Sequence, residues 1–128
     1  MKAQILAAIE GRKVELQKVL ERTRNRMQQD FKYFFCYESV ETYRAVYLLE
    51  RLEQLQKDVE ETTSVEELTE LIRKDMESHL RRLTDRELFA STSYQMVNIS
   101  RNIEVEAAQI LYRFLANLYN YKLKAQNK

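Results

Sequence analysis

The chain contains no proline and a single glycine among its 128 residues, and this restricts its fold more than any other feature. Glycine and proline are the residues that most often form turns and end strands, and phosphate-binding loops depend on glycine. Without them, long helices with very short connections are expected. Because apolar residues make up 45% of the chain, it is also too apolar for a disordered polymer. We therefore predict an all-α fold.

The length predicts one helical-bundle domain over residues 1–128, since single domains commonly run to roughly 100–150 residues. The longest apolar runs, such as residues 45–49, are much shorter than the roughly 18 residues that a membrane span needs, so no membrane association is expected. The first ten residues lack the pattern of a secretory signal, and the single cysteine cannot form a disulfide within the chain. These features predict a cytoplasmic protein.

Apolar residues recur at helical spacing along almost the whole chain. This periodicity predicts four helices, at about residues 2–36, 39–61, 65–83 and 85–124. Ser39 is the expected N-cap of the second helix. Because no glycine or proline separates Cys36 from Val40, one helix of about sixty residues is the alternative.

Capping patterns mark the later helices. Ser64 and Glu67 have the spacing of a capping box, in which the two residues satisfy free backbone N–H groups at a helix start. Thr84 and Glu87 repeat that spacing. These two patterns predict where the third and fourth helices begin.

Short connections make successive helices antiparallel, which predicts an up-down-up-down four-helix bundle with long first and last helices. A turn near Tyr37 would place Leu16 beside Val59. In the second pair, Ile72 would lie beside Val97. In this register, residues at both chain ends extend beyond the two middle helices.

The predicted overhang, residues 1–11 and 105–124, carries more apolar surface than two helices can bury against each other. Exposed patches of this kind mark interfaces. The expected interface residues are Ile5, Ile9, Ile110, Leu111, Phe114, Leu115, Leu118 and Tyr121. Gly11 lies where the overhang begins, where it either permits a close backbone approach or is a helix defect costing about 1 kcal/mol relative to alanine.

The net charge of +1 hides an uneven distribution. Residues 1–37 carry 8 basic and 4 acidic groups, a net charge of +4, whereas residues 38–70 carry 3 basic and 10 acidic groups, a net charge of −7. The candidate phosphate contacts on the first helix are Lys18, Arg22, Arg24 and Arg26. Nucleic-acid readers usually have a strongly basic domain, so ion pairing with Glu50 and Glu53 of the second helix is the preferred interpretation.

The sequence predicts no catalytic residue, no metal ligand and no cofactor. His79 is the single histidine and falls on an apolar stripe, where a packed side chain is expected. Di-metal helical bundles need two Glu-x-x-His pairs, which one histidine cannot supply. Cys36 lies among aromatic residues, a setting that does not activate a thiol.

Aromatic residues gather near the predicted turn between the first two helices. They are Phe31, Tyr33, Phe34, Phe35, Tyr37, Tyr43, Tyr47 and Phe89. A core cluster is the first interpretation, a partner interface the second and a ligand pocket the third.

We expect a non-enzymatic helical interaction protein that self-associates as a homodimer through the overhang. The first alternative is an adaptor or chaperone-like module that receives an amphipathic helix of a partner protein. The second is a weak nucleic-acid binder that uses the basic first helix. A small-ligand sensor or enzyme built around the tyrosines and His79 is the last.

Overall fold

The computed structural model describes residues 1–84 and 94–123 as an assembly of helices. The elements are α1 (Lys2–Gln29), α2 (Phe31–Tyr33), the π-helical turn η1 (Phe34–Glu38), α3 (Ser39–Glu60), α4 (Val65–Thr84), α5 (Gln95–Leu118) and the π-helical turn η3 (Tyr119–Leu123). The predicted all-α fold of four helices with a long first and a long last helix is confirmed, since α1 has 28 residues and α5 has 24.

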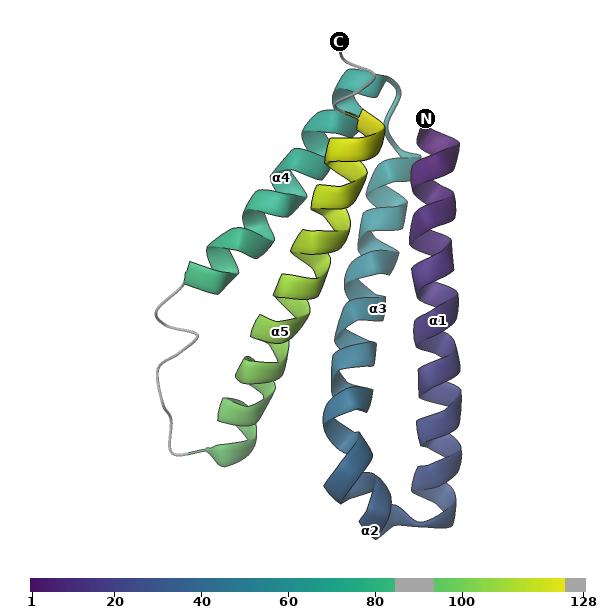
Figure 1. Ribbon diagram of the computed structural model, residues 1–128, viewed down its shortest axis with the longest axis vertical. Coiled ribbons are helices and arrows are strands. Elements are labelled where there is room, and N and C mark those ends of the chain that lie inside the picture. Colours follow the sequence, from purple (N-terminus) through teal and green to yellow (C-terminus); the bar gives the residue numbers. More distant parts are fainter. Residues whose placement is uncertain (85–93, 124–128) are drawn as a thin grey trace.

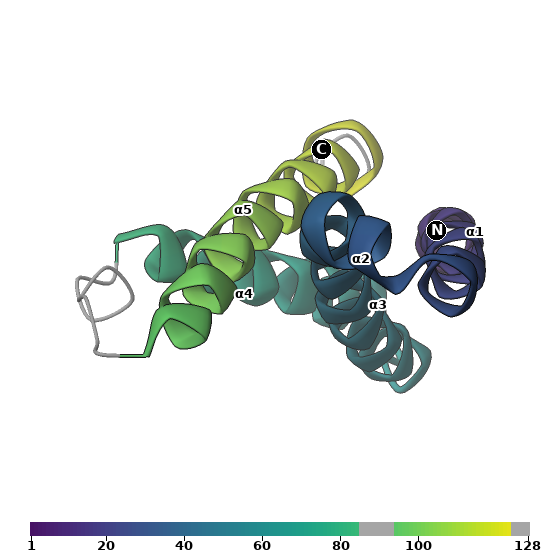
Figure 2. The same ribbon diagram turned by 90° about the horizontal axis from the view of Figure 1, so that it is seen from below.

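The helices are arranged as two pairs, α1 beside α3 and α4 beside α5 (Figure 1). Lys2 near the start of α1 donates from Nζ to the carbonyl of Glu60 at the end of α3, at 2.6 Å. At the other end of this pair, Arg26 Nε lies 3.2 Å from Glu38 Oε1, so α1 and α3 run antiparallel. The two pairs diverge toward the end of the molecule where α2 lies (Figures 1 and 2).

The turn between α1 and α3 lies at Asp30. Its backbone is non-helical, with φ −150° and ψ 84°, and its carboxylate accepts a hydrogen bond from the Tyr33 backbone N–H at 3.2 Å. The predicted turn near Tyr37 and the predicted N-cap at Ser39 are therefore wrong. Helical structure runs from residue 31 to residue 60 through η1, and Ser39 Oγ donates back to the Phe35 carbonyl at 2.6 Å. Aspartate is a strong N-cap, and here its capping ends the first helix seven residues early.

This early turn changes the register of the first pair. Lys13 Nζ donates to Gln56 Oε1 at 2.6 Å, and Lys2 Nζ also donates to the Thr62 carbonyl at 2.9 Å. Residues 1–11 are therefore level with the end of α3 and do not extend beyond it. The predicted pairing of Leu16 with Val59 is wrong for the same reason.

The second pair is also shifted from the predicted register. Arg82 Nη2 lies 3.8 Å from Glu104 Oε2, which places Ile72 level with residue 114 rather than with Val97. The last residues of α5 therefore lie beside the start of α4 and do not form an overhang. The predicted start of the fourth helix at residue 85, and its cap by Thr84 and Glu87, fall on residues 85–93 and lie outside the described residues.

One buried apolar cluster joins the four helices toward the end where they converge. Its members are Ile5, Ile9, Tyr47, Leu48, Leu52, Leu55, Val59, Leu68, Ile72, Ala107, Leu111, Leu115, Leu118 and Leu123. Gly11 is exposed on α1, and a Cβ added there would meet nothing within 4 Å. The close backbone approach considered for Gly11 is therefore wrong, and Gly11 is a helix defect.

The predicted capping box at the start of α4 is confirmed. Ser64 Oγ accepts from the Glu67 backbone N–H at 3.1 Å, and the Glu67 carboxylate accepts from the Thr63 backbone N–H at 2.9 Å. Within residues 1–84 and 94–123, none of the helices combines the length and apolar character needed to cross a bilayer.

Candidate interaction surface

Most of the predicted overhang is part of the core. Ile5, Ile9, Leu111, Leu115 and Leu118 are all buried within the chain. An exposed overhang, the premise of the predicted interface, is therefore wrong, because both registers place these residues between helices. Three of the expected interface residues keep some exposure. Tyr121 is exposed, Ile110 is 40% exposed, and Phe114 is half-buried beneath the Arg12 guanidinium, 5.6 Å from the ring centroid.

The large exposed apolar side chains gather instead at the opposite end, around α2 and η1. Phe31 and Phe35 are each more than half exposed, and their stacked rings have centroids 6.1 Å apart. Tyr37 is 75% exposed. The expectation of an aromatic core holds only for Tyr47, which is buried, while Phe89 lies outside the described residues. Within η1, Phe35 and Tyr37 are exposed and Phe34 is half-buried.

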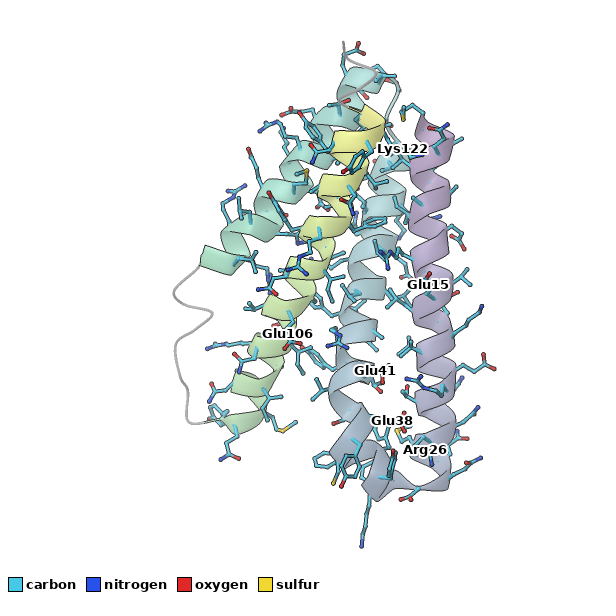
Figure 3. All side chains as sticks on the ribbon, viewed as in Figure 1. Glu15, Arg26, Glu38, Glu41, Glu106 and Lys122 are labelled. Carbon is cyan, nitrogen blue, oxygen red and sulfur yellow. The ribbon has the colours of Figure 1, made fainter. Side chains whose placement is uncertain are left out.

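Further exposed apolar residues at this end lie on the stripes of α3 and α5 that face each other. Arg44 Nη1 lies 3.3 Å from Glu106 Oε2, which identifies the facing stripes, and Figure 3 shows Glu106 on the side of α5 next to α3. Val40 lies one turn before Arg44 and is 46% exposed. On α5, Ile99 and Met96 lie on the stripe of Glu106 at helical spacing and are 43% and 63% exposed.

These side chains form what we call the open-end surface. It consists of Phe31, Phe35, Val40 and Tyr43 on the first helix pair and Met96 and Ile99 on the second. Given their exposed fractions, they present on the order of 500 Å² of mostly apolar area. This area is divided between the two helix pairs. For comparison, the largest contiguous apolar patch on a typical monomer is about 300–600 Å² and is often functional.

The basic residues of α1 are partly engaged with acidic residues of the first pair. Arg22 Nη2 lies 2.6 Å from Glu41 Oε1, and Arg26 pairs with Glu38 (Figure 3). Pairing with the acidic segment is therefore found, but the partners are Glu38 and Glu41 rather than Glu50 and Glu53, because the register is shifted.

The other two candidate phosphate contacts, Lys18 and Arg24, are exposed. Arg24 borders a groove of about 550 Å³ that is lined by residues of α1 together with Phe34 and Thr42. The groove is open to solvent, whereas ligand pockets enclose most of the surface of their ligand.

Tyr47 joins α3 to the end of α4. Two guanidinium groups lie over its ring, that of Arg51 at 5.0 Å and that of Arg82 at 5.6 Å from the ring centroid. Cation–π contacts of this kind contribute about 0.5–2 kcal/mol each. This contact fixes the level at which α4 ends against α3, above the open-end surface.

The residues considered for chemistry take different positions. His79 is packed, as expected, with Nε2 3.3 Å from Asp75 Oδ2. Cys36 is exposed rather than enclosed by its aromatic neighbours. Across the described residues, no three His, Cys, Asp or Glu side chains gather closely enough to hold a metal ion.

No protein family, no curated protein and no solved structure matches this chain. The features that bear on its function are therefore the geometry and chemistry of its own residues.

Proposed function

We propose that this chain is a non-enzymatic helical interaction protein that associates with a second copy of itself through the open-end surface. The observation that carries the proposal is the position of the exposed apolar side chains. Phe31, Phe35 and Met96 are each more than half exposed, and they lie at one end rather than scattered singly over the molecule. Scattered apolar residues need no explanation, whereas a gathered patch indicates a binding surface.

The composition of this surface supports a protein partner. Aromatic residues and methionine are enriched at protein interfaces, and charged residues are depleted at their centres. Residues 33–37 and 94–100 contain no charged residue, although charged residues make up 32% of the chain. Covering them would therefore remove few ionic groups from water. The single cysteine, exposed and unpaired, supports a reducing cytoplasmic setting.

An adaptor role is the alternative. In that case the same surface would receive an amphipathic helix of a different protein, whose apolar residues would cover the aromatic side chains. The two functions share the surface and differ in the oligomeric state of the isolated chain. A self-associating protein is a dimer at micromolar concentration, whereas an adaptor is a monomer that binds an apolar dye.

The test compares two exposed apolar positions. Phe35→Asp places a charge in the open-end surface, and Val14→Asp places one on α1, where the native side chain is also exposed, at 39%. We expect Phe35→Asp to dissociate the dimer in light scattering while circular dichroism stays helical, and Val14→Asp to leave the mass unchanged. A wild-type monomer whose dye binding is the same in both variants would contradict any role for this surface.

A further inference from the structure

The open-end surface consists of two halves on different helix pairs. The aromatic half contains Phe31, Phe35, Val40 and Tyr43, and the α5 half contains Met96 and Ile99. Helices α3 and α5 run in the same direction (Figure 1). Arg44 and Glu106, 62 positions apart in sequence, are level with each other. By that offset, Met96 is level with the aromatic residues of η1. Both halves therefore lie at the same height of the bundle.

Within one chain, the two halves do not cover each other. Ile103, one turn from Glu106, is only 5% exposed, but Ile99 one turn further is 43% exposed. Helix α5 is continuous over 24 residues and diverges from α3 toward its beginning (Figures 1 and 2). Closing the gap would require α5 to bend or to leave α4, where Arg82 contacts Glu104. An intact α-helix resists such a bend.

We propose that the α5 half of one copy lies on the aromatic half of a second copy, and the reverse, about a twofold axis. This inference rests on the proposed function and specifies its geometry. In a twofold dimer, a pair of unlike surfaces on each chain is used twice, so both halves are covered in both copies without further growth. Met96 is suited to contact the exposed phenylalanine rings, because a thioether packs favourably against aromatic rings.

The area and the charges favour a second copy as the occupant. A standard interface covers about 800 Å² on each partner, and the two halves together provide on the order of 500 Å² of mostly apolar area as its centre. Either half alone would provide only part of that area. The α5 half lies in an uncharged stretch, residues 94–100. Beside the aromatic half, Glu38 and Glu41 are already paired with Arg26 and Arg22, so few unpaired charges of like sign face each other when two copies meet.

The native cysteine allows a direct test. Cys36 is exposed and adjoins Phe35 in the aromatic half. The wild-type chain is mixed with the double variant Cys36→Ser, Met96→Cys and treated with a short bismaleimide. Because each chain carries one cysteine, every cross-link joins two chains, and the mixed product is recognised by its mass. The matched control is Cys36→Ser, Gln109→Cys, since Gln109 is exposed on α5 but lies more than three helical turns away from Met96.

We expect the mixed product to form at least about tenfold faster with the cysteine at position 96 than with the cysteine at position 109. Equal rates at the two positions, in a sample that light scattering shows to be dimeric, would overturn this geometry and leave self-association standing. A single variant Met96→Cys that links to its own Cys36 as a monomer would also overturn it, because the halves would then close within one chain. If the chain is a monomer and Phe35→Asp abolishes its binding of apolar dye, the twofold geometry is overturned and the surface is assigned to a different partner.

Discussion

The carboxylate of Asp30 accepts a hydrogen bond from the backbone N–H of Tyr33, at 3.2 Å, and this cap sets where the first helix pair turns. Because the turn comes at Asp30, the start of α1 lies beside the end of α3, and Ile5 and Ile9 become fully buried. The same turn leaves Phe31 and Phe35 at the outer end of the pair, exposed. The position of this turn therefore accompanies the division of the apolar residues between core and surface.

Replacing the cap tests this relationship. Asp30→Ala removes the acceptor, and we expect it to lower the free energy of unfolding by about 1 kcal/mol, the usual cost of losing an N-cap. Asp30→Asn keeps an acceptor at the same position and is the matched control. Urea denaturation followed by circular dichroism measures both variants. Equal stability of the alanine and asparagine variants would show that the side chain does not cap α2.

Replacing Gly11 should raise the free energy of unfolding rather than lower it. Gly11→Ala is expected to raise the free energy of unfolding by roughly 0.5–1 kcal/mol, because alanine loses less backbone entropy in a helix and its Cβ meets no neighbour within 4 Å. Ala7→Gly, at another exposed position of α1, should lower it by a similar amount. Thermal melts of the two variants provide the comparison. A destabilised Gly11→Ala would mean that another backbone approaches this position.

The predicted overhang near the end of α5 contains both buried and exposed residues, and substitutions can distinguish them. Leu115→Ala is expected to lower the free energy of unfolding by about 2–5 kcal/mol, as for other buried leucines, because Leu115 is fully buried. Tyr121→Ala, at the 78% exposed position of the same predicted overhang, should change it by less than about 0.5 kcal/mol. Chemical denaturation at low protein concentration measures both. Similar losses of stability at the two positions would contradict the assignment of Leu115 to the core and would support the predicted overhang.

The exposed ion pairs of α4 predict a small pH dependence. The hydrogen bond from Arg73 is the largest cause of the shift. Together with smaller Coulomb attractions of Arg73 and Lys74 it outweighs desolvation, and it holds the pKa of Glu70 below its ordinary value of 4.5. A carboxyl whose folded pKa is depressed adds stability above the unfolded pKa, and this stability is lost as the pH falls through the folded pKa. The stabilisation from Glu70 should therefore be lost below about pH 4.5. Because both side chains of the pair are nearly half exposed, salt should weaken the effect.

The measurement is an NMR titration of the Glu70 side chain in the wild type and in Arg73→Gln. Removal of the guanidinium should return the pKa of Glu70 toward 4.5, while the helical content stays the same. A pKa that does not move between the two proteins would assign its depression to another cause.

Several features could be predicted from the sequence because they depend on local patterns. The lack of proline and glycine predicted helices, the apolar spacing predicted four of them, and Ser64 with Glu67 predicted the start of α4. The packed position of His79 followed from the stripe on which it falls. Each of these depends on residues within one or two helical turns of each other.

The register, and with it the candidate surface, was decided by the tertiary structure. A turn at Asp30 instead of Tyr37 brings Glu38, rather than residue 49, level with Arg26, a shift in pairing of eleven residues or about three full turns of an α-helix. Such a shift keeps the same apolar stripe facing the partner, so periodicity cannot distinguish the two registers. The sequence by itself determined which face of each helix is apolar. Only the packing of whole helices decided that Ile9 is enclosed and Phe35 is exposed, because burial depends on which residues lie at the same height.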